Sequence, residues 1–181
     1  MLNRILAFII LLGLTPLLFL LMLFILMDDG FPLIFKQKRV GRNYYFFELY
    51  KFRTMKTNAP NVASHLLVNP KQYLTKVGGA LRKLSLDELP NLINILKGDM
   101  VFVGPRPALY NQFDLMELRV ATGISQLKPG LTGWAQINGR DEISIYQKVI
   151  LEIKYLEKKS LIFDLKIFFL TFTSLFLKRH Q

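Results

Sequence analysis

Asp87 and Glu88 are adjacent carboxylates within the segment RKLSLDELPNLINILKGDMVFVGPRP, which runs from Arg82 to Pro107 in a chain of 181 residues. An ionised carboxylate that is held in place can attack an electrophilic phosphorus. Two carboxylates can also bind a hard divalent cation such as Mg²⁺, which bridges to a diphosphate. Acidic residues are equally common as simple helix caps. The pair therefore indicates either a phosphoryl-transfer site or helix capping alone.

Both carboxylates are expected at the start of a short helix that begins at Ser85 or at Leu89. Ser85 and Glu88 match the S-x-x-E capping pattern, and Pro90 suits a first helical turn. The positive end of such a helix would favour ionised carboxylates. Gly98 is expected to end it. Four apolar residues are spaced for one helical face: Leu89, Leu92, Ile93 and Leu96.

Two arginines flank the carboxylates. Arg82 precedes them, and Arg106 follows the helix inside Gly104-Pro105-Arg106-Pro107. Proline on both sides restricts the backbone around Arg106 and pre-organises a planar guanidinium that suits phosphate oxygens. A salt bridge from Arg106 back to the acids is the structural alternative, and the two roles are compatible.

The composition limits the chemistry further. The chain has no Cys and two His, His65 and His180, which excludes disulfides, a thiol nucleophile and zinc-thiolate sites and argues against a His-based metal cluster. Lys and Arg total 24 against 13 acidic residues, a net charge of +11. This charge fits an anionic membrane surface, an anionic substrate or nucleic acid.

The N-terminal segment from Ile5 to Met27 is an uncharged apolar run, long enough at about 1.5 Å per residue to cross a hydrocarbon core of about 30 Å. Pro16 cannot donate to the Leu12 carbonyl, so a bend is expected at Thr15-Pro16, and Thr15 can bond the Leu11 carbonyl. A kinked membrane-spanning helix and a helix that returns to the same face both satisfy this pattern.

The segment from Phe31 to Met55 is expected to form short strands. Its basic stretch Phe35–Arg39 and aromatic stretch Tyr44–Phe47 could indicate nucleic-acid binding. However, a nucleic-acid module has no use for the apolar run, and aromatic residues beside lysines suit a membrane interface. We therefore expect no nucleic-acid partner. Lys51 and Arg53 are two residues apart and would share one strand face.

Three further segments follow. Pro107 to Gly123 is expected to be an amphipathic helix whose apolar face comprises Leu109, Phe113, Met116 and Val120. Lys128 to Arg140 is glycine-rich and suits either a phosphate-binding loop or a turn-rich connector. Phe163 to Leu177 is expected to be an interfacial or core helix, followed by Lys178-Arg179, with Leu165, Phe168, Phe169, Phe172 and Phe176 on one face.

Five segments together resemble bacterial sugar transferases of the small monotopic polyprenyl-phosphate phosphoglycosyl transferase family. They are FKQKRVG from Phe35, YKFRTM from Tyr50, LRKLSLDELPNLINILKGDMVFVGPRP from Leu81, KPGLTGWAQINGR from Lys128 and SLIFDLKIFF from Ser160. The resemblance covers most of the chain from Phe35 onward, in the family's order. It implies an α+β fold, mostly helical, with a re-entrant N-terminal membrane helix, interfacial amphipathic helices and a small β-hairpin.

The resemblance also implies where the parts of the chain lie. Residues 1–27 would be the re-entrant anchor, bent at Thr15-Pro16, and residues 28–181 the catalytic domain at the cytoplasmic face of a bacterial inner membrane. Re-entry would place Asn3 and Asp29 on the same face.

The implied reaction moves a sugar 1-phosphate from a UDP-sugar to a polyprenyl phosphate such as undecaprenyl phosphate and releases UMP. Asp87 would be the covalent nucleophile, and Glu88 would help to bind Mg²⁺ or position the acceptor. Arg82, Arg106 and Lys51 would offset phosphate charge. Glu152 stands where the family usually has Asp, and its role is open. The alternative, a non-catalytic membrane adaptor, is disfavoured by the intact Asp87-Glu88 pair.

Overall fold

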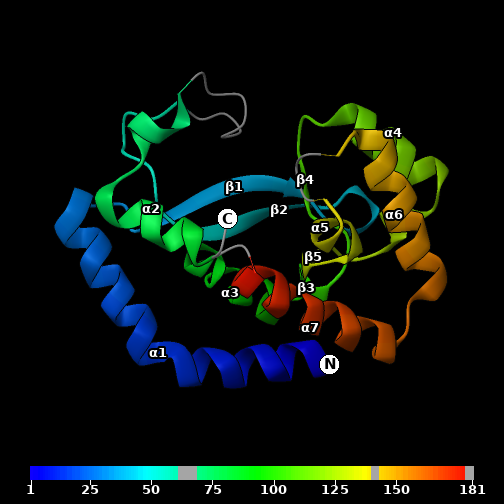
Figure 1. Ribbon diagram of the computed structural model, residues 1–181, viewed down its shortest axis with the longest axis horizontal. Coiled ribbons are helices and arrows are strands. Elements are labelled where there is room, and N and C mark those ends of the chain that lie inside the picture. The colour runs from blue at the N-terminus through cyan, green and yellow to red at the C-terminus, as the bar shows by residue number, and fades with distance from the viewer. Residues whose placement is uncertain (61–68, 140–142, 178–181) are drawn as a thin grey trace.

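The computed structural model describes residues 1–60, 69–139 and 143–177, with side chains through Thr173 (Figure 1). His65, Arg140 and the Lys178-Arg179 pair lie outside the described residues. The described chain is mostly helical with a few short strands, which confirms the predicted α+β class. In chain order its elements are α1 (Leu2–Asp29), β1 (Ile34–Val40), η1 (Arg42–Tyr44), β2 (Phe46–Phe52), η3 (Pro70–Tyr73), α2 (Lys76–Lys83), η4 (Leu86–Glu88), α3 (Asn91–Lys97), β3 (Val101–Val103), β4 (Ala108–Leu109), α4 (Phe113–Ala121), η5 (Ile124–Gln126), β5 (Gly130–Thr132), α5 (Trp134–Ile137), α6 (Ile145–Lys158) and α7 (Leu161–Leu177).

The first helix, α1, runs along one side of the molecule and turns near its middle (Figure 1). Pro16 lies inside the helix, and the Thr15 hydroxyl donates to the Leu11 carbonyl at 3.0 Å, which is the local bond expected for a bend at this point. By length and composition α1 could cross a membrane. It ends at Asp29, just beyond the apolar run.

The N-terminal end of α1 is bonded to the segment around the end of α3. The side-chain oxygen of Asn3 accepts a hydrogen bond from the Phe102 amide at 3.2 Å, and Arg4 donates to the Lys97 carbonyl at 2.5 Å. A cation at the carbonyl end of a helix is stabilising because it meets unpaired carbonyl groups. This end of α1 is therefore attached to the core of the molecule.

The C-terminal end of α1 is bonded to the same folded body. Asp28 accepts from the Val77 amide in the first turn of α2 at 2.8 Å. Asp29 forms a salt bridge of 2.7 Å with Arg53, which also donates to the carbonyls of Asp29 and Gly30. Both ends of α1 thus meet one domain, on either side of the bend.

Two small sheets form the centre. The expected strands between Phe31 and Met55 are confirmed as the antiparallel hairpin of β1 and β2, and β4 pairs with the other edge of β1. A second sheet pairs β3 with β5 in parallel and was not predicted. It was missed because β5 falls inside the segment interpreted as a glycine-rich loop. Figure 1 shows α4 and α6 at the end of the molecule opposite the C-terminal half of α1.

The segment after Ser85 differs in detail from the prediction. Ser85 has a φ of 56° and its side chain makes no capping bond, so the predicted capping box is wrong. A 3₁₀ turn, η4, carries both carboxylates, and α3 starts after Pro90. Gly98 ends α3 with a φ of 92°, as predicted.

The buried face of α3 is also not the expected one. Leu92 is buried as predicted, but it is joined by Ile95, while Ile93 and Leu96 are exposed. The reason is that α3 packs on two elements at once. Leu92 and Ile95 meet Ala7 of α1, and the buried amide of Asn94 bonds the backbone of β2.

Of the apolar face predicted for residues 107–123, Met116 is buried as expected, but the rest of the prediction is wrong. The helix α4 starts only at Phe113, and Phe113 and Val120 are exposed. Its buried residues are Leu115, Met116 and Arg119, because α4 packs against α6, where Arg119 has an anionic partner.

The last helix, α7, begins two residues earlier than predicted, at Leu161. The apolar residues expected on one face are exposed in the part whose side chains are described: Leu165, Phe168, Phe169 and Phe172. Ile167, by contrast, is fully buried against Val103 and Tyr155. An exposed aromatic face on a short helix is typical of an interfacial position.

Candidate active site

Three of the five cationic and acidic residues predicted for the site line one hollow. Lys51 comes from β2, Glu88 from η4 and Arg106 from the turn after β3. Lys51 Nζ lies 2.6 Å from Glu88 Oε1, and Arg106 Nη2 lies 3.7 Å from the same oxygen. The salt bridge considered for Arg106 is therefore present. Glu88 is bound by two cations, both of which also face the hollow.

Asp87 lies next to this cluster and is only 9% exposed. Burial raises the pKa of its carboxyl above the ordinary value of 3.8, and the neighbouring Glu88 raises it further. Lys51 and Arg82 oppose this by favouring the charged form. A local backbone hydrogen bond does favour the ionised form of Asp87, as expected for a helix start, but desolvation is the larger effect and the net shift of the pKa is upward.

Arg82, on the last turn of α2, is held close to Asp87. Its Nε donates to the buried Thr54 hydroxyl at 2.8 Å. Burial lowers the pKa of the Arg82 guanidinium, and Asp87 raises it. The approach of α2 to Thr54 requires glycine at position 78, since a Cβ there would clash with the Thr54 carbonyl. Backbone packing therefore sets where Arg82 sits.

The YKFRTM segment supplies three separate contacts. Lys51 pairs with Glu88, and Thr54 accepts from Arg82. Arg53 lies beyond the end of β2 and forms a salt bridge with Asp29. The two cations of the segment, Lys51 and Arg53, therefore pair with different carboxylates. One short stretch thus connects α1 to both carboxylates of the site.

The turn that carries Arg106 is fixed by packing against the glycine-rich segment. The Gly104 amide donates to the Thr132 carbonyl at 2.9 Å, and the Gly130 amide donates to the Pro105 carbonyl at 2.8 Å. A Cβ at Gly130 or Gly133 would clash with the backbone of Gly104. These glycines are explained by close backbone packing, which supports a structural role for this part of the segment.

Glu152 and Arg119 form a buried ion pair beside that turn. Glu152 is 1% exposed, and its oxygens accept from Arg119 Nε at 2.8 Å and Nη2 at 2.5 Å. Sequence reasoning left the role of Glu152 open and did not select Arg119. A signal was available: an arginine on the side of α4 that also carries Leu115 and Met116 requires a buried anion.

Two further residues of the hollow were missed. Arg39 comes from the basic stretch of β1, where strand alternation separates it from the exposed Lys36 and Lys38. Asn91 opens α3, is 3% exposed, and its Oδ1 is buried without a hydrogen-bond partner. An unpaired buried acceptor costs about 1–3 kcal/mol, which suggests that this oxygen has a ligand.

The donor set fits Mg²⁺. Within residues 1–60, 69–139 and 143–177, no three His, Cys, Asp or Glu side chains form a cluster that could hold a metal. Mg²⁺, however, is commonly bound through one or two carboxylates together with substrate phosphates. Glu88 and Asn91 line the hollow and supply a carboxylate and an amide oxygen, and Asp87, the chain neighbour of Glu88, supplies a second carboxylate beside it.

Comparison with known proteins is consistent with this geometry. The family model described as "Bacterial sugar transferase" matches residues 1–178. The chain is 48% identical over 142 residues to "Uncharacterized sugar transferase EpsL" of Bacillus subtilis, covering 78% of this chain and 69% of that protein. It is 37% identical over 188 residues to "Exopolysaccharide production protein ExoY" of Sinorhizobium fredii, covering 96% and 83%. It is 38% identical over 174 residues to the "UDP-glucose:undecaprenyl-phosphate glucose-1-phosphate transferase" of Escherichia coli, covering 92% of this chain and 38% of that one. The chain that carries Asp87 and its cationic surroundings therefore belongs to the bacterial sugar transferase family of enzymes.

Proposed function

We propose that this enzyme transfers a sugar 1-phosphate from a UDP-sugar to a polyprenyl phosphate, such as undecaprenyl phosphate, and releases UMP. The observation that carries the proposal is a buried carboxylate, Asp87, among cations that can bind a diphosphate: Lys51, Arg82 and Arg106. The Escherichia coli relative is named for this type of reaction.

In the first step, an oxygen of ionised Asp87 attacks the phosphorus that carries the sugar. The bond from that phosphorus to the oxygen bridging the two phosphates breaks, and UMP leaves with the electron pair. In the second step, a phosphate oxygen of the lipid attacks the same phosphorus. The Asp87–phosphorus bond breaks, which regenerates the carboxylate and gives a polyprenyl-diphosphate sugar.

The surrounding residues have distinct tasks in this scheme. Lys51 and Arg106 face the hollow and offset the negative charge of the diphosphate, while Arg82 favours the ionised form of Asp87. Glu88 holds Lys51 in place through a close salt bridge and contributes only a weak, longer contact to Arg106. Mg²⁺ held by Asp87 and Glu88, with Asn91 nearby, would neutralise further charge on the diphosphate.

The membrane helix supports access to a lipid substrate. Because Asn3 and Asp29 are both bonded to one domain, α1 is proposed to enter and leave the bilayer by the same face, at the cytoplasmic side of the bacterial inner membrane. The exposed apolar residues of α7 and α3 would then meet the interface.

Purified enzyme supplied with undecaprenyl phosphate, Mg²⁺ and a panel of UDP-sugars tests the proposal through UMP release. At least one sugar should give UMP, and brief incubation with that sugar in the absence of the lipid should add a sugar phosphate to Asp87, detectable by peptide mass spectrometry. An adduct on another residue would refute the role of Asp87. No UMP with any UDP-sugar would favour a non-catalytic adaptor.

A further inference from the structure

The Arg106 side chain is only weakly held at its guanidinium end. The Arg106 side chain is 37% exposed, and its Nη2 lies 3.7 Å from Glu88 Oε1, too far for a good hydrogen bond. The direction of this side chain must therefore come largely from the backbone of the turn.

Three consecutive carbonyl groups around Arg106 each accept a hydrogen bond. The Pro105 carbonyl accepts from the Gly130 amide at 2.8 Å. The Arg106 carbonyl accepts from Arg119 Nη2, and the Pro107 carbonyl accepts from Arg39 Nη1, both at 3.0 Å. The two donors on the C-terminal side are thus long side chains from α4 and β1. With all three peptide planes fixed, the Cα–Cβ direction of Arg106 is fixed as well.

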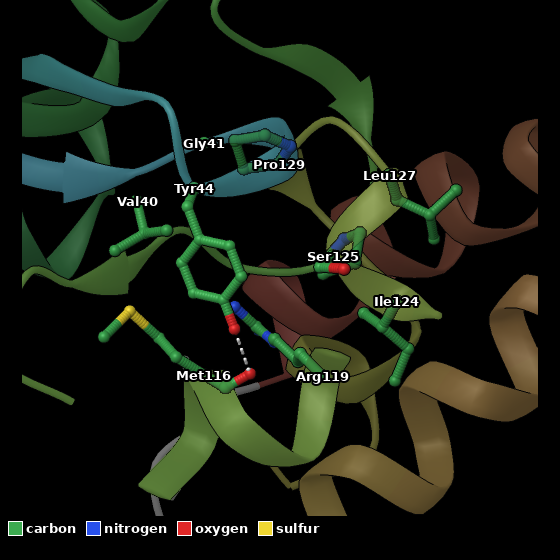
Figure 2. A pocket seen from close by; sticks show the side chains of 10 residues that line it. Val40, Gly41, Tyr44, Met116, Arg119, Ile124, Ser125, Leu127 and Pro129 are labelled. Atoms are coloured by element: carbon green, nitrogen blue, oxygen red, sulfur yellow. Dashed lines mark hydrogen bonds between the residues drawn. The ribbon is translucent and has the colours of Figure 1, made fainter. Parts of the chain in front are cut away.

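Arg119 reaches this turn from a hollow behind it. Figure 2 shows its guanidinium extending from α4 toward the Tyr44 ring, whose hydroxyl donates to the Met116 carbonyl at 2.7 Å. Pro105, Val40 and Pro129 line this hollow, whereas their neighbours Arg106, Arg39 and Gly130 line the hollow of the site. The two hollows are therefore separated by the turn and the adjacent strand ends.

Glu152 is what allows a guanidinium to be buried at this position. Its two oxygens take two Arg119 donors, and Arg119 Nη2 also bonds the Arg106 carbonyl. A buried ion pair usually contributes little net stability compared with an apolar pair of similar size. A contribution to stability therefore does not explain why Arg119 and Glu152 are buried here. The contact that sets the pair apart is the hydrogen bond from Arg119 to the Arg106 carbonyl.

We propose that Arg119, held by Glu152, and Arg39 are positioning residues that aim the Arg106 guanidinium at the diphosphate of the substrate. The inference rests on the phosphate-binding role proposed for Arg106. It assigns a task to the residue at position 152, to a residue of α4 and to a residue of the basic strand.

The central test replaces the ion pair with apolar residues of similar length, Arg119→Met with Glu152→Met. Such a replacement should leave the unfolding temperature nearly unchanged. It should nevertheless lower kcat/KM for the UDP-sugar by about 10²-fold, because the turn is no longer fixed. The matched control is Arg42→Met, at an exposed arginine in the turn between β1 and β2. It should change neither the unfolding temperature nor kcat/KM. A folded double variant with normal kcat/KM would overturn the inference.

A mutant cycle shows whether the pair acts through Arg106. In an Arg106→Ala background, the same double replacement should cause no further loss of UDP affinity or of kcat/KM. A full additional loss would mean that the pair acts elsewhere, which contradicts the inference. If Arg106→Ala alone has no effect, the proposed role of Arg106 fails instead, so the two failures are distinguishable.

Conservative single variants provide a second route if the double variant does not fold. Arg39→Lys and Arg119→Lys keep the charge but not the geometry of the guanidinium. Each should lower kcat/KM for the UDP-sugar while UMP release remains measurable, and the unfolding temperature should change little. Unchanged kinetics in both folded variants would overturn the inference.

Discussion

Lys51 Nζ lies 2.6 Å from Glu88 Oε1, and the same ammonium group is the largest of the charges that lower the pKa of the buried Asp87. One lysine thus holds one carboxylate in place and tunes the other. One lysine can interact with both acids because they are adjacent in the chain and share the 3₁₀ turn η4. It also makes the protonation state of Asp87 depend on a residue of the hairpin.

The first prediction concerns the pH profile. Asp87 must be ionised to act as a nucleophile, and Lys51 lowers its pKa against the effect of burial. In Lys51→Met the pKa of Asp87 should rise, so the acid limb of the kcat/KM profile should move to higher pH and activity should partly recover on the alkaline side. Lys36→Met, which removes an exposed lysine of the same hairpin, is the control and should leave the limb in place. If the acid limb of the kcat/KM profile does not move in Lys51→Met, Lys51 does not control the pKa of Asp87.

The second prediction is that Asp87→Asn abolishes turnover, by on the order of 10³-fold or more, without harming the fold. The sign of the stability effect follows from the raised pKa of Asp87. The folded state binds the Asp87 proton more tightly than the unfolded state. The resulting contribution to the free energy of unfolding is therefore present below the ordinary pKa of 3.8 and is lost as the pH rises. Asp87→Asn has no carboxyl at this position and does not lose stability in this way.

Unfolding temperatures of the wild type and Asp87→Asn, measured from acid to neutral pH, check this directly. The unfolding temperature of Asp87→Asn should rise relative to that of the wild type as the pH increases. At neutral pH the variant should be at least as stable as the wild type. A variant that is clearly less stable at neutral pH would show that the ionised carboxylate is well stabilised where it lies.

The third prediction is that Arg106→Lys loses roughly 10-fold or more in kcat/KM, because a point charge cannot reproduce the planar donor of a guanidinium. The fold should be retained, since the Arg106 backbone and not its side chain bonds Arg119. Arg42→Lys is a suitable control for the exchange itself. Unchanged kinetics in Arg106→Lys would return Arg106 to a structural role.

Sequence reasoning located the main parts of the candidate site because they are local. The Asp87-Glu88 pair, the Pro-flanked Arg106 and the apolar helix with Thr15-Pro16 are each visible within a few residues. The strands between Phe31 and Met55 were predictable for the same reason, whereas their hairpin was implied by the family resemblance. In each case the neighbours in the chain decide the structure.

The features that were missed depend on contacts between distant segments. Ser85 fits a capping pattern, but it lies at a positive φ where the chain passes from α2 into the 3₁₀ turn that carries the acids. Ile93 and Ile95 are equally apolar, and the packing of α3 against α1 and β2 decides that Ile95 is buried. The partnership of Arg119 with Glu152 spans 33 positions and has no local pattern.

The last prediction concerns the path of α1. The bonds from Asn3 to Phe102 and from Asp29 to Arg53 hold both ends of the helix to one domain, which supports re-entry at the bend. A helix that spans the bilayer would have to break one set of these bonds, because the domain cannot lie on both sides. Since the chain has no native Cys, single cysteines can be labelled without background.

Leu2 and Phe31 are exposed residues next to the two anchored ends, so Leu2→Cys and Phe31→Cys leave the anchoring bonds intact. Both should react with an impermeant thiol reagent only after the inner membrane is opened. Tyr45→Cys, at an exposed position on the hairpin, marks the face of the membrane on which the hairpin lies. If position 2 reacts in cells with only the outer membrane permeabilised, while positions 31 and 45 remain protected, then α1 spans the bilayer and the proposed topology is wrong.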